Sequence, residues 1–364
     1  MALQPADLRP ETLNTIRPAV RALKPYLVGL IPDLRVKLNQ NESPYGLPDD
    51  LKRELLESFM DVEVNRYPTE HPYDLIDALA AKHGIDPKGL LLGNGSNEVM
   101  YTFGYTLISP GTKVVLPAPM FSLWSKIAAL FEADLTTVPC RPDFSFDAEA
   151  LLEAVRREQP ALTVLTTPNN PTGLAMSIDE IEPIVAASPG IVVVDEAYVE
   201  FRREESALSL LERYPNVISL RTFSKAYGLA GLRLGYMIGH PEIIQELMKA
   251  RLPFQIDRFA EHIGLALLDR PGLISERIAT MQANTATLTS ALGAMSGVEV
   301  IPSQTSFVLF KTPHPADTIL KRLASAGVLI RNMGGYPELR GYLRVNTGTD
   351  AENKVFLDTL EAAL

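Results

Sequence analysis

The chain of 364 residues is 46% hydrophobic and 21% charged, which is typical of a soluble globular protein with room for two domains. Its formal charge of −10 argues against a nucleic-acid partner, because a phosphate backbone requires a basic protein face. No apolar run approaches the ~18 residues of a membrane span, and neither the five histidines nor the single cysteine, Cys140, show metal-ligand spacing.

Residues 1–48 are rich in proline and asparagine, and we expect them to pack on the C-terminal part of the chain rather than to fold alone. The start, MALQPADLRPETLN, lacks the basic start and the apolar stretch of a signal peptide. One cysteine cannot form an internal disulfide, so we expect the protein to reside in a reducing cytoplasm.

From about residue 50 onward, short apolar runs alternate with amphipathic helical patterns such as 147–159 and 177–188. The alternation predicts an α/β fold with a doubly wound, mostly parallel sheet and helices on both faces. Ligands of such sheets bind at the carboxyl ends of the strands. The runs predicted as strands are 90–93, 113–117, 134–139, 161–167, 190–195, 216–222 and 234–239.

After residue 240 the pattern changes. A long helical stretch, 271–295, is followed by shorter strand-like and helical segments and by a last helix at 350–364. These elements predict a smaller α+β unit. We therefore expect a large domain at 49–255 and a small domain made of 1–48 and 256–364.

The motif GNGSNE (93–98) follows the first predicted strand and leads into a helix that begins near Ser96. Backbone N–H groups at such a helix start suit a phosphate group. A simple capped helix, with Ser96 or Asn97 as the cap, is the alternative. A dinucleotide fingerprint is excluded, because GxGxxG requires glycine at the position of Glu98.

Two further polar motifs follow buried-looking strands. In PNNPTG (168–173), prolines and a glycine form a turn that presents asparagine amides above the sheet edge, unless it is only a turn. In VVDEAY (193–198), Asp195 ends a β-branched run. Its buried carboxylate needs a cation or a hydrogen-bond donor, unless it caps a following helix.

The segment RTFSKAYGLAGLRLGY (221–236) places Lys225 among small, aromatic and apolar residues. An ordinary solvated lysine is one interpretation, and a desolvated amine that forms a Schiff base is the other. Thr222, Ser224 and Arg233 add hydroxyls and a guanidinium that suits phosphate. A phosphate anchor, a carboxylate, an amide, a phenol and an amine together form the set that binds pyridoxal 5′-phosphate.

The ordered motifs GNGSNE, PNNPTG, VVDEAY, RTFSKAYGLAGLRLGY and LRVNTGT make this chain resemble the fold-type I pyridoxal-phosphate aminotransferases. Within them it most resembles the histidinol-phosphate aminotransferases, from KPY (24–26) to YLRVNTGT (342–349). The resemblance implies an aspartate-aminotransferase-like fold with a seven-stranded, mainly parallel sheet and a small domain from both chain ends. It also implies a homodimer with shared active sites.

Position by position, the resemblance implies that Lys225 bonds the cofactor and later transfers the proton, while Asp195 pairs with the pyridine nitrogen. Asn170 and Tyr198 match the residues that bond the cofactor's 3-oxygen. Phe121 stands where the family often has a tyrosine stacked on the ring, so stacking is retained but a hydroxyl role is lost. The phosphate cup is matched by Gly95, Ser96, Asn97, Thr222, Ser224 and Arg233.

Other positions match contacts with the substrate and the second subunit. Tyr67 matches a tyrosine that reaches the cofactor phosphate of the neighbouring subunit, although interface packing is a simpler role for it. Arg344 matches the arginine that binds the anionic end of the substrate, with Arg331 as its companion or as a member of a surface ion pair. Tyr26 and Asn41 match the N-terminal lid over the substrate, and Asn41 could instead be only a turn residue.

The resemblance implies transfer of an amino group between L-histidinol phosphate and 2-oxoglutarate, with glutamate as the second product. Aromatic-amino-acid aminotransferases share almost every motif and stay open as an alternative, as does a threonine-phosphate decarboxylase. A nicotinamide oxidoreductase is disfavoured because the glycine fingerprint is missing. A transcription regulator on the same fold would need a DNA-binding module, for which 1–48 leaves no room.

Overall fold

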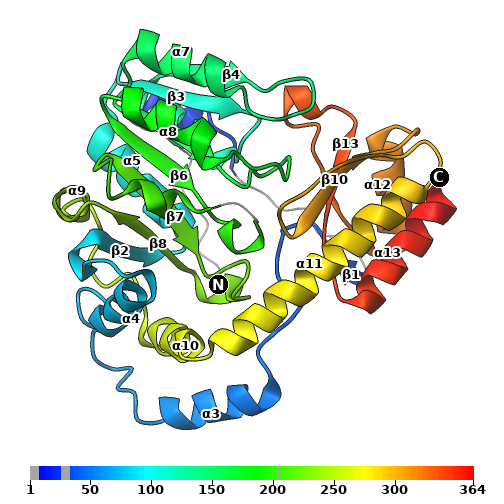
Figure 1. Cartoon of the computed structure of the whole chain (residues 1–364), viewed down its shortest axis with the longest axis horizontal. Helices are drawn as coiled ribbons and strands as arrows, with labels where there is room; N and C mark the ends of the chain where they lie inside the picture. The colour runs from blue at the N-terminus through cyan, green and yellow to red at the C-terminus, as the bar shows by residue number, and fades with distance from the viewer. Residues whose placement is uncertain (1–7, 26–32, 203–204) are drawn as a thin grey trace.

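The computed structural model describes residues 8–25, 33–202 and 205–364, and its largest element is a seven-stranded sheet (Figure 1). The strand order is β2-β8-β7-β6-β5-β3-β4, with β8 antiparallel to its neighbours and the other pairs parallel. All seven predicted strands are present within one residue of their expected ends, which confirms the doubly wound sheet. The strands are β2 (Leu90–Asn94), β3 (Lys113–Ala118), β4 (Asp134–Pro139), β5 (Leu162–Thr166), β6 (Ile191–Asp195), β7 (Val217–Thr222) and β8 (Leu234–Gly239).

Helices bury the sheet in two hydrophobic clusters. In β2, Leu91 belongs to the cluster formed with α5, whereas Leu90 and Leu92 belong to the cluster formed with α4 and α10. This division follows from the two-residue period of a strand. In the central β6, Val192, Val193 and Val194 are all fully buried, as expected of a strand covered on both faces. The surrounding helices are α3 (Asp49–Phe59), α4 (Tyr73–His83), α5 (Ser96–Leu107), α6 (Leu123–Leu130), α7 (Ala148–Glu158), α8 (Ile178–Ala187), α9 (Pro241–Met248) and α10 (Arg258–Leu268).

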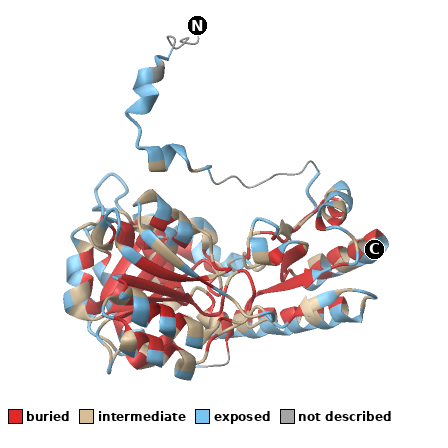
Figure 2. Ribbon diagram, turned by 90° about the horizontal axis from the view of Figure 1, so that it is seen from above, coloured by how far each residue is buried: buried red, intermediate tan, exposed pale blue. Residues whose placement is uncertain are grey.

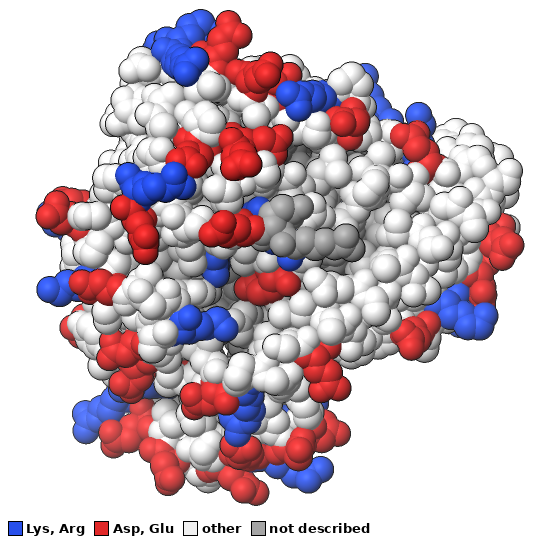
Figure 3. All heavy atoms as spheres, in the orientation of Figure 1, with Lys and Arg blue, Asp and Glu red and all other residues white. Residues whose placement is uncertain are grey.

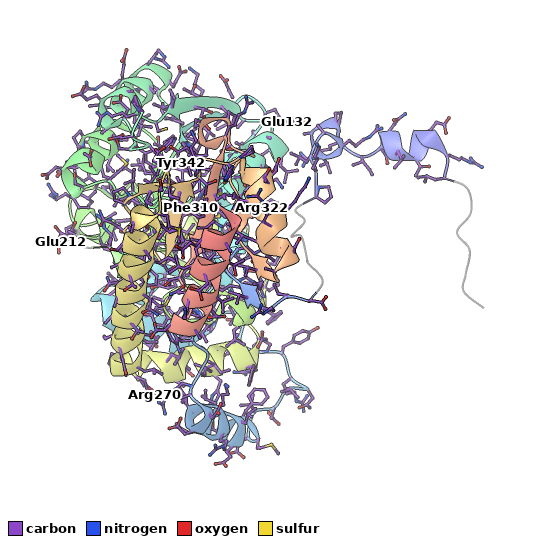
Figure 4. The ribbon with its side chains drawn as sticks, turned by 90° about the vertical axis from the view of Figure 1, so that its right-hand side faces the viewer. Glu132, Glu212, Arg270, Phe310, Arg322 and Tyr342 are labelled. Atoms are coloured by element: carbon purple, nitrogen blue, oxygen red, sulfur yellow. The ribbon has the colours of Figure 1, made fainter. Side chains whose placement is uncertain are left out.

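A second, four-stranded sheet in the order β12-β13-β10-β9 is covered by the long helix α11 and by α13 (Figure 1). Phe310 of β10 lies in this core against Phe356 of α13, with ring centroids 6.1 Å apart (Figure 4). The predicted α+β unit is therefore confirmed. Its elements are β9 (Glu299–Ile301), β10 (Phe307–Lys311), β11 (Val328–Leu329), β12 (Arg331–Asn332), β13 (Tyr342–Asn346), α11 (Pro271–Ala294), α12 (Ala316–Ser325) and α13 (Asp350–Ala363).

The N-terminal residues only partly follow our expectation. Strand β1 (Val36–Lys37) pairs with β11, and Val36 is buried in the core of the C-terminal unit, as predicted. The short helices α1 (Pro10–Asn14) and α2 (Pro18–Arg21) instead stand away from both sheets (Figures 2 and 4). Helices this short bury little apolar surface, and α2 contacts α6.

The division into a domain at 49–255 and a unit from both chain ends stays a prediction. Helix α10, which this division assigns to the second unit, packs against α3 and α4. Within the described ranges, no helix is both long and apolar enough to cross a membrane. Acidic and basic side chains are interspersed over the face shown in Figure 3.

The register of the sheet brings the polar motifs together. Thr166 at the end of β5 pairs with Asp195 at the end of β6, and Asp195 pairs with Leu220 near the end of β7. The segments after these three strands, which carry Asn170 and Lys225, therefore leave the sheet at one edge. The start of α5 reaches the same edge by packing closely on β8, where a Cβ atom on Gly235 would lie 2.0 Å from the amide nitrogen of Ser96.

We expect Gly235→Ala to destabilise the protein by about 1–3 kcal/mol, because the added methyl group must push α5 away from β8. Thermal denaturation would measure this effect. Gly272→Ala in α11 is the matched control, since no atom lies within 4 Å of its added Cβ and alanine favours helix. Equal melting temperatures for the two variants would contradict the close approach of α5 and β8.

Candidate active site

A cavity of about 1080 Å³ lies at the carboxyl ends of β5, β6 and β7 and extends to β12 and β13. Segment 39–42 and the start of α5 complete its wall. Most of the residues singled out in the sequence line this one space. They are Asn41, Ser96, Asn97, Phe121, Asn170, Asp195, Tyr198, Thr222, Ser224, Lys225, Arg233, Arg331 and Arg344.

The first turn of α5 has the geometry and charge that suit an anion. Gly95 is its N-cap, with φ +78°, and makes no side-chain cap, so the alternative in which Ser96 or Asn97 caps the helix is wrong. The Arg233 guanidinium lies against Gly95, where a Cβ atom would stand 2.2 Å from Nη2. Because a helix start and a guanidinium both attract negative charge, this corner suits a phosphate group. Thr222 lines the same cavity.

Asp195 is 6% exposed and has only neutral hydrogen-bond donors among the described residues. Trp124 Nε1 donates to Oδ2 at 3.0 Å and the Ala197 amide donates to Oδ1 at 3.3 Å. Burial raises the pKa of the Asp195 carboxyl to about 6 despite these donors. The following 3-10 helix begins at Val199 with Tyr198 as its N-cap, so the helix-cap interpretation of Asp195 is wrong.

The adjacent carboxylate, Glu196, is buried with a charged partner. Burial alone would raise its pKa, but Arg221 Nη2, 3.0 Å from Oε2, and the Ser219 hydroxyl bring the pKa below its usual value. Asp195 has no such cation among the described residues, so its negative charge is best stabilised by a cation on a ligand. A protonated ring nitrogen meets this requirement, and the donor set therefore fits pyridoxal phosphate.

Lys225 is directed at the N-terminal segment. Its Nζ donates to the carbonyl oxygens of Asn41 at 3.0 Å and Gln40 at 3.2 Å. Desolvation, followed by the charges of Arg344 and Arg233, lowers the pKa of the Lys225 amine to about 8. This lowering of the pKa agrees with the interpretation of Lys225 as a reactive amine, and it disagrees with the interpretation of Lys225 as a solvated surface lysine.

Asn41, Tyr198 and Asn170 form a polar wall beside Lys225. The Asn41 side-chain amide donates to the Tyr198 hydroxyl at 2.8 Å, and burial raises the pKa of that hydroxyl to about 12. Asn41 adopts a left-handed backbone conformation, with φ +54°, and it is 1% exposed and lines the cavity. Arg344 donates to the Asn170 side-chain oxygen and, at 3.2 Å, to the carbonyl of Asn39.

The two predicted substrate arginines face each other. Arg331 of β12 pairs directly with Arg344 of β13 in the antiparallel register, and both line the cavity. Like charges directly opposite one another on a sheet repel. The pair is therefore suited to an anion that lies between the two guanidinium groups.

Two predicted residues lie elsewhere. Tyr67 is 80% exposed and stacks on Phe254, with ring centroids 4.9 Å apart, and it does not line the cavity. Tyr26 lies outside the described residues. Sequence reasoning missed Trp124, which the motif PAPMFSLW shows only as one more apolar residue, and Tyr336, which lines the cavity beyond β12.

We expect capture of pyridoxal phosphate by the apo protein to accelerate about tenfold per pH unit up to about pH 8, because only the neutral Lys225 amine attacks an aldehyde. Above that pH the rate should level off. Stopped-flow absorbance would measure the profile, and Arg344→Met should move its bend to higher pH. A bend near the ordinary lysine value of 10.5 would contradict the desolvated amine.

The model of the family described as aminotransferase class I and II matches residues 35–360. A curated histidinol-phosphate aminotransferase from Chlorobaculum tepidum is 42% identical over 346 residues, covering 95% of this chain and 99% of that protein. One from Chlorobaculum parvum is 40% identical over 347 residues, covering 95% and 98%.

Solved structures agree. Histidinol-phosphate aminotransferase from Sinorhizobium meliloti, in complex with pyridoxal 5′-phosphate, matches with a TM-score of 0.85 and 27% identity, covering 95% of this chain and 96% of that one. An aspartate aminotransferase from Thermus thermophilus, 20% identical with a TM-score of 0.80 over 96% of this chain and 99% of that one, shares the fold. The chain therefore belongs to the class I and II aminotransferase family, the pyridoxal-phosphate-dependent enzymes of fold type I.

Proposed function

We propose that this protein transfers the amino group of L-histidinol phosphate to 2-oxoglutarate, giving glutamate. Curated relatives named histidinol-phosphate aminotransferase, at 37–42% identity over nearly the whole chain, support the reaction. The observation that carries the substrate class is the direct pairing of Arg331 with Arg344 across β12 and β13.

Bound pyridoxal phosphate supplies the aldehyde that carries the amino group and the ring that delocalises the electrons released at the substrate carbon. We propose that Asp195 holds the proton on the ring nitrogen. The backbone N–H groups at the start of α5, with Thr222, Ser224 and Arg233, would bind the phosphate. Tyr198 and Asn170 would bond the 3-oxygen, and Phe121 would cover the ring.

Lys225 has two tasks in this proposal. Its neutral amine bonds the cofactor, which the lowered pKa favours. Nζ would also remove the proton from the amino-bearing carbon of the substrate and later return it. Whenever the lysine is not bonded to the cofactor, the hydrogen bonds from Nζ to the carbonyls of Gln40 and Asn41 would hold it at the cavity wall.

The arginine pair must serve two different anions. Histidinol phosphate carries a phosphomethyl group where an amino acid carries its α-carboxylate, and 2-oxoglutarate brings carboxylates to the same pocket. A guanidinium binds both groups through a bidentate fork. An aromatic amino acid carries a single negative charge and would leave part of this donor set without a partner, which disfavours it as a substrate.

We expect kcat/KM for histidinol phosphate to exceed that for phenylalanine by about 10–100-fold, with 2-oxoglutarate as acceptor, because buried donors left unpaired cost about 1–3 kcal/mol each. Arg331→Ala should reduce the ratio of kcat/KM for histidinol phosphate to kcat/KM for phenylalanine. Arg340→Ala, an exposed arginine outside the cavity, is the control and should leave the ratio unchanged. Phenylalanine turnover equal to or faster than that of histidinol phosphate would favour an aromatic-amino-acid aminotransferase.

The partner in solution is proposed to be a second copy of the chain. Several large apolar side chains in the segments 56–67 and 252–254 are exposed, among them the predicted partner-reaching Tyr67. They are Leu56, Met60, Val64, Tyr67, Leu252 and Phe254. Exposed apolar surface of this kind marks an association site. Among these residues, the Tyr67 ring is stacked on Phe254, and Tyr67 is 80% exposed, so a neighbouring subunit could reach its hydroxyl.

Subunit complementation tests this arrangement. If Tyr67 serves the partner's site, a hybrid of Tyr67→Ala and Lys225→Ala subunits contains one intact site, although each variant alone is nearly inactive. Random exchange of subunits makes half of the dimers hybrids, and each hybrid has one intact site of two. The mixture should therefore regain about a quarter of wild-type activity, as expected for a two-fold dimer. The control is Arg344→Ala with Lys225→Ala, whose hybrid contains no intact site. Equal failure of both pairs would contradict a shared site.

A further inference from the structure

The indole of Trp124 holds the Asp195 carboxylate, which lines the cavity and has no cationic partner among the described residues. Trp124 is 2% exposed and does not line the cavity, and its Nε1 donates to Asp195 Oδ2 at 3.0 Å. We propose that Trp124 is a positioning residue, which fixes the Asp195 carboxylate in the orientation that receives the ring nitrogen of pyridoxal phosphate.

The orientation of Asp195 needs such a partner. The terminal torsion of an aspartate side chain is broad, so packing alone does not select one rotation of the carboxylate. The only other donor to it among the described residues is the Ala197 amide, at a long 3.3 Å from Oδ1. The Trp124 bond is the shorter of the two and occupies one oxygen, which leaves a defined direction for the ring nitrogen.

An indole is suited to this task because it orients the carboxylate without neutralising it. The indole N–H is a donor only and carries no charge, so it cannot take the proton shared between Asp195 and the ring nitrogen. Glu196 shows the contrasting arrangement, since Arg221 neutralises it. An arginine in place of Trp124 would pair with Asp195 and weaken its attraction for a protonated ring.

Trp124 is itself fixed by the elements that hold the rest of the cofactor site. Its amide donates to the carbonyl of Phe121 at 3.2 Å, so one turn presents Phe121 to the cavity and Trp124 to Asp195. Its ring packs on Phe103 of α5, with centroids 5.8 Å apart. Because α5 begins at the phosphate cup, this contact links the support of the ring nitrogen to the phosphate site.

The chain contains a single tryptophan, which allows an isosteric test. Incorporation of 3-benzothienylalanine for tryptophan alters only position 124 and replaces the N–H by sulfur with little change in shape. Trp124→Phe is the second variant, and it also lacks the donor. Each apo protein is titrated with pyridoxal phosphate and with its 1-deaza analogue, in which carbon replaces the ring nitrogen.

Loss of one hydrogen bond to a charged group should weaken pyridoxal phosphate binding roughly tenfold and leave binding of the deaza analogue unchanged. In the holoenzyme, kcat should fall while KM for the amino donor stays within about twofold. Phe103→Leu is the control, because it disturbs the same ring packing but retains the donor. It should not reproduce the selective loss.

Equal losses for both ligands, or no loss for either, would overturn the proposal, and so would a selective loss in Phe103→Leu that matches the Trp124 variants. The inference rests on the cofactor alone and not on the proposed amino donor. The titrations contain no substrate, so an error in the substrate assignment would leave their outcome unchanged.

Discussion

Two successive buried carboxylates at the end of β6 are the constraint to which the rest of the site responds. Asp195 is 6% exposed and Glu196 is fully buried. A carboxylate removed from water must be neutralised or supplied with donors. Glu196 is neutralised by Arg221, whereas Asp195 has only neutral donors among the described residues, so its charge is directed into the cavity. We infer from this difference that Glu196 has a structural role, whereas Asp195 faces a ligand.

The Glu196 ion pair supports the loops that carry the chemistry. Its Oε2 accepts from the Ser219 hydroxyl at 2.6 Å, and its Oε1 accepts from the Ala207 amide at 2.9 Å. Together with Arg221, these bonds join the end of β6 to β7 and to the segment after Ser206. The strand ends that present Asp195 and Lys225 are thus held in register from behind, by groups that do not line the cavity.

The strands of the sheet could be predicted well from the sequence, but the hydrogen bonds between distant segments could not. Central parallel strands are continuous apolar runs that end in polar motifs, so their bounds could be read almost to the residue. The bond between Trp124 and Asp195 joins positions 71 residues apart and depends on how α6 approaches β6. The contact of Lys225 with the Asn41 carbonyl spans 184 residues. Residues 18–21 departed from our expectation for another reason, since a helix as short as α2 presents too little apolar surface to be buried, and it contacts α6 rather than the C-terminal unit.

In the proposed reaction, the facing arginines would connect substrate binding to the lysine. Arg344 lies opposite Arg331 and also lowers the pKa of Lys225, so an anion bound between the two guanidinium groups offsets part of that charge. The pKa of the lysine would therefore rise when an anionic substrate enters. In the proposed reaction, Lys225 would be most readily neutral before that point, when it bonds the cofactor. With the substrate bound, it would hold more firmly the proton that it removes from the substrate, until it returns that proton. A single arginine pair would then serve both anion recognition and proton transfer.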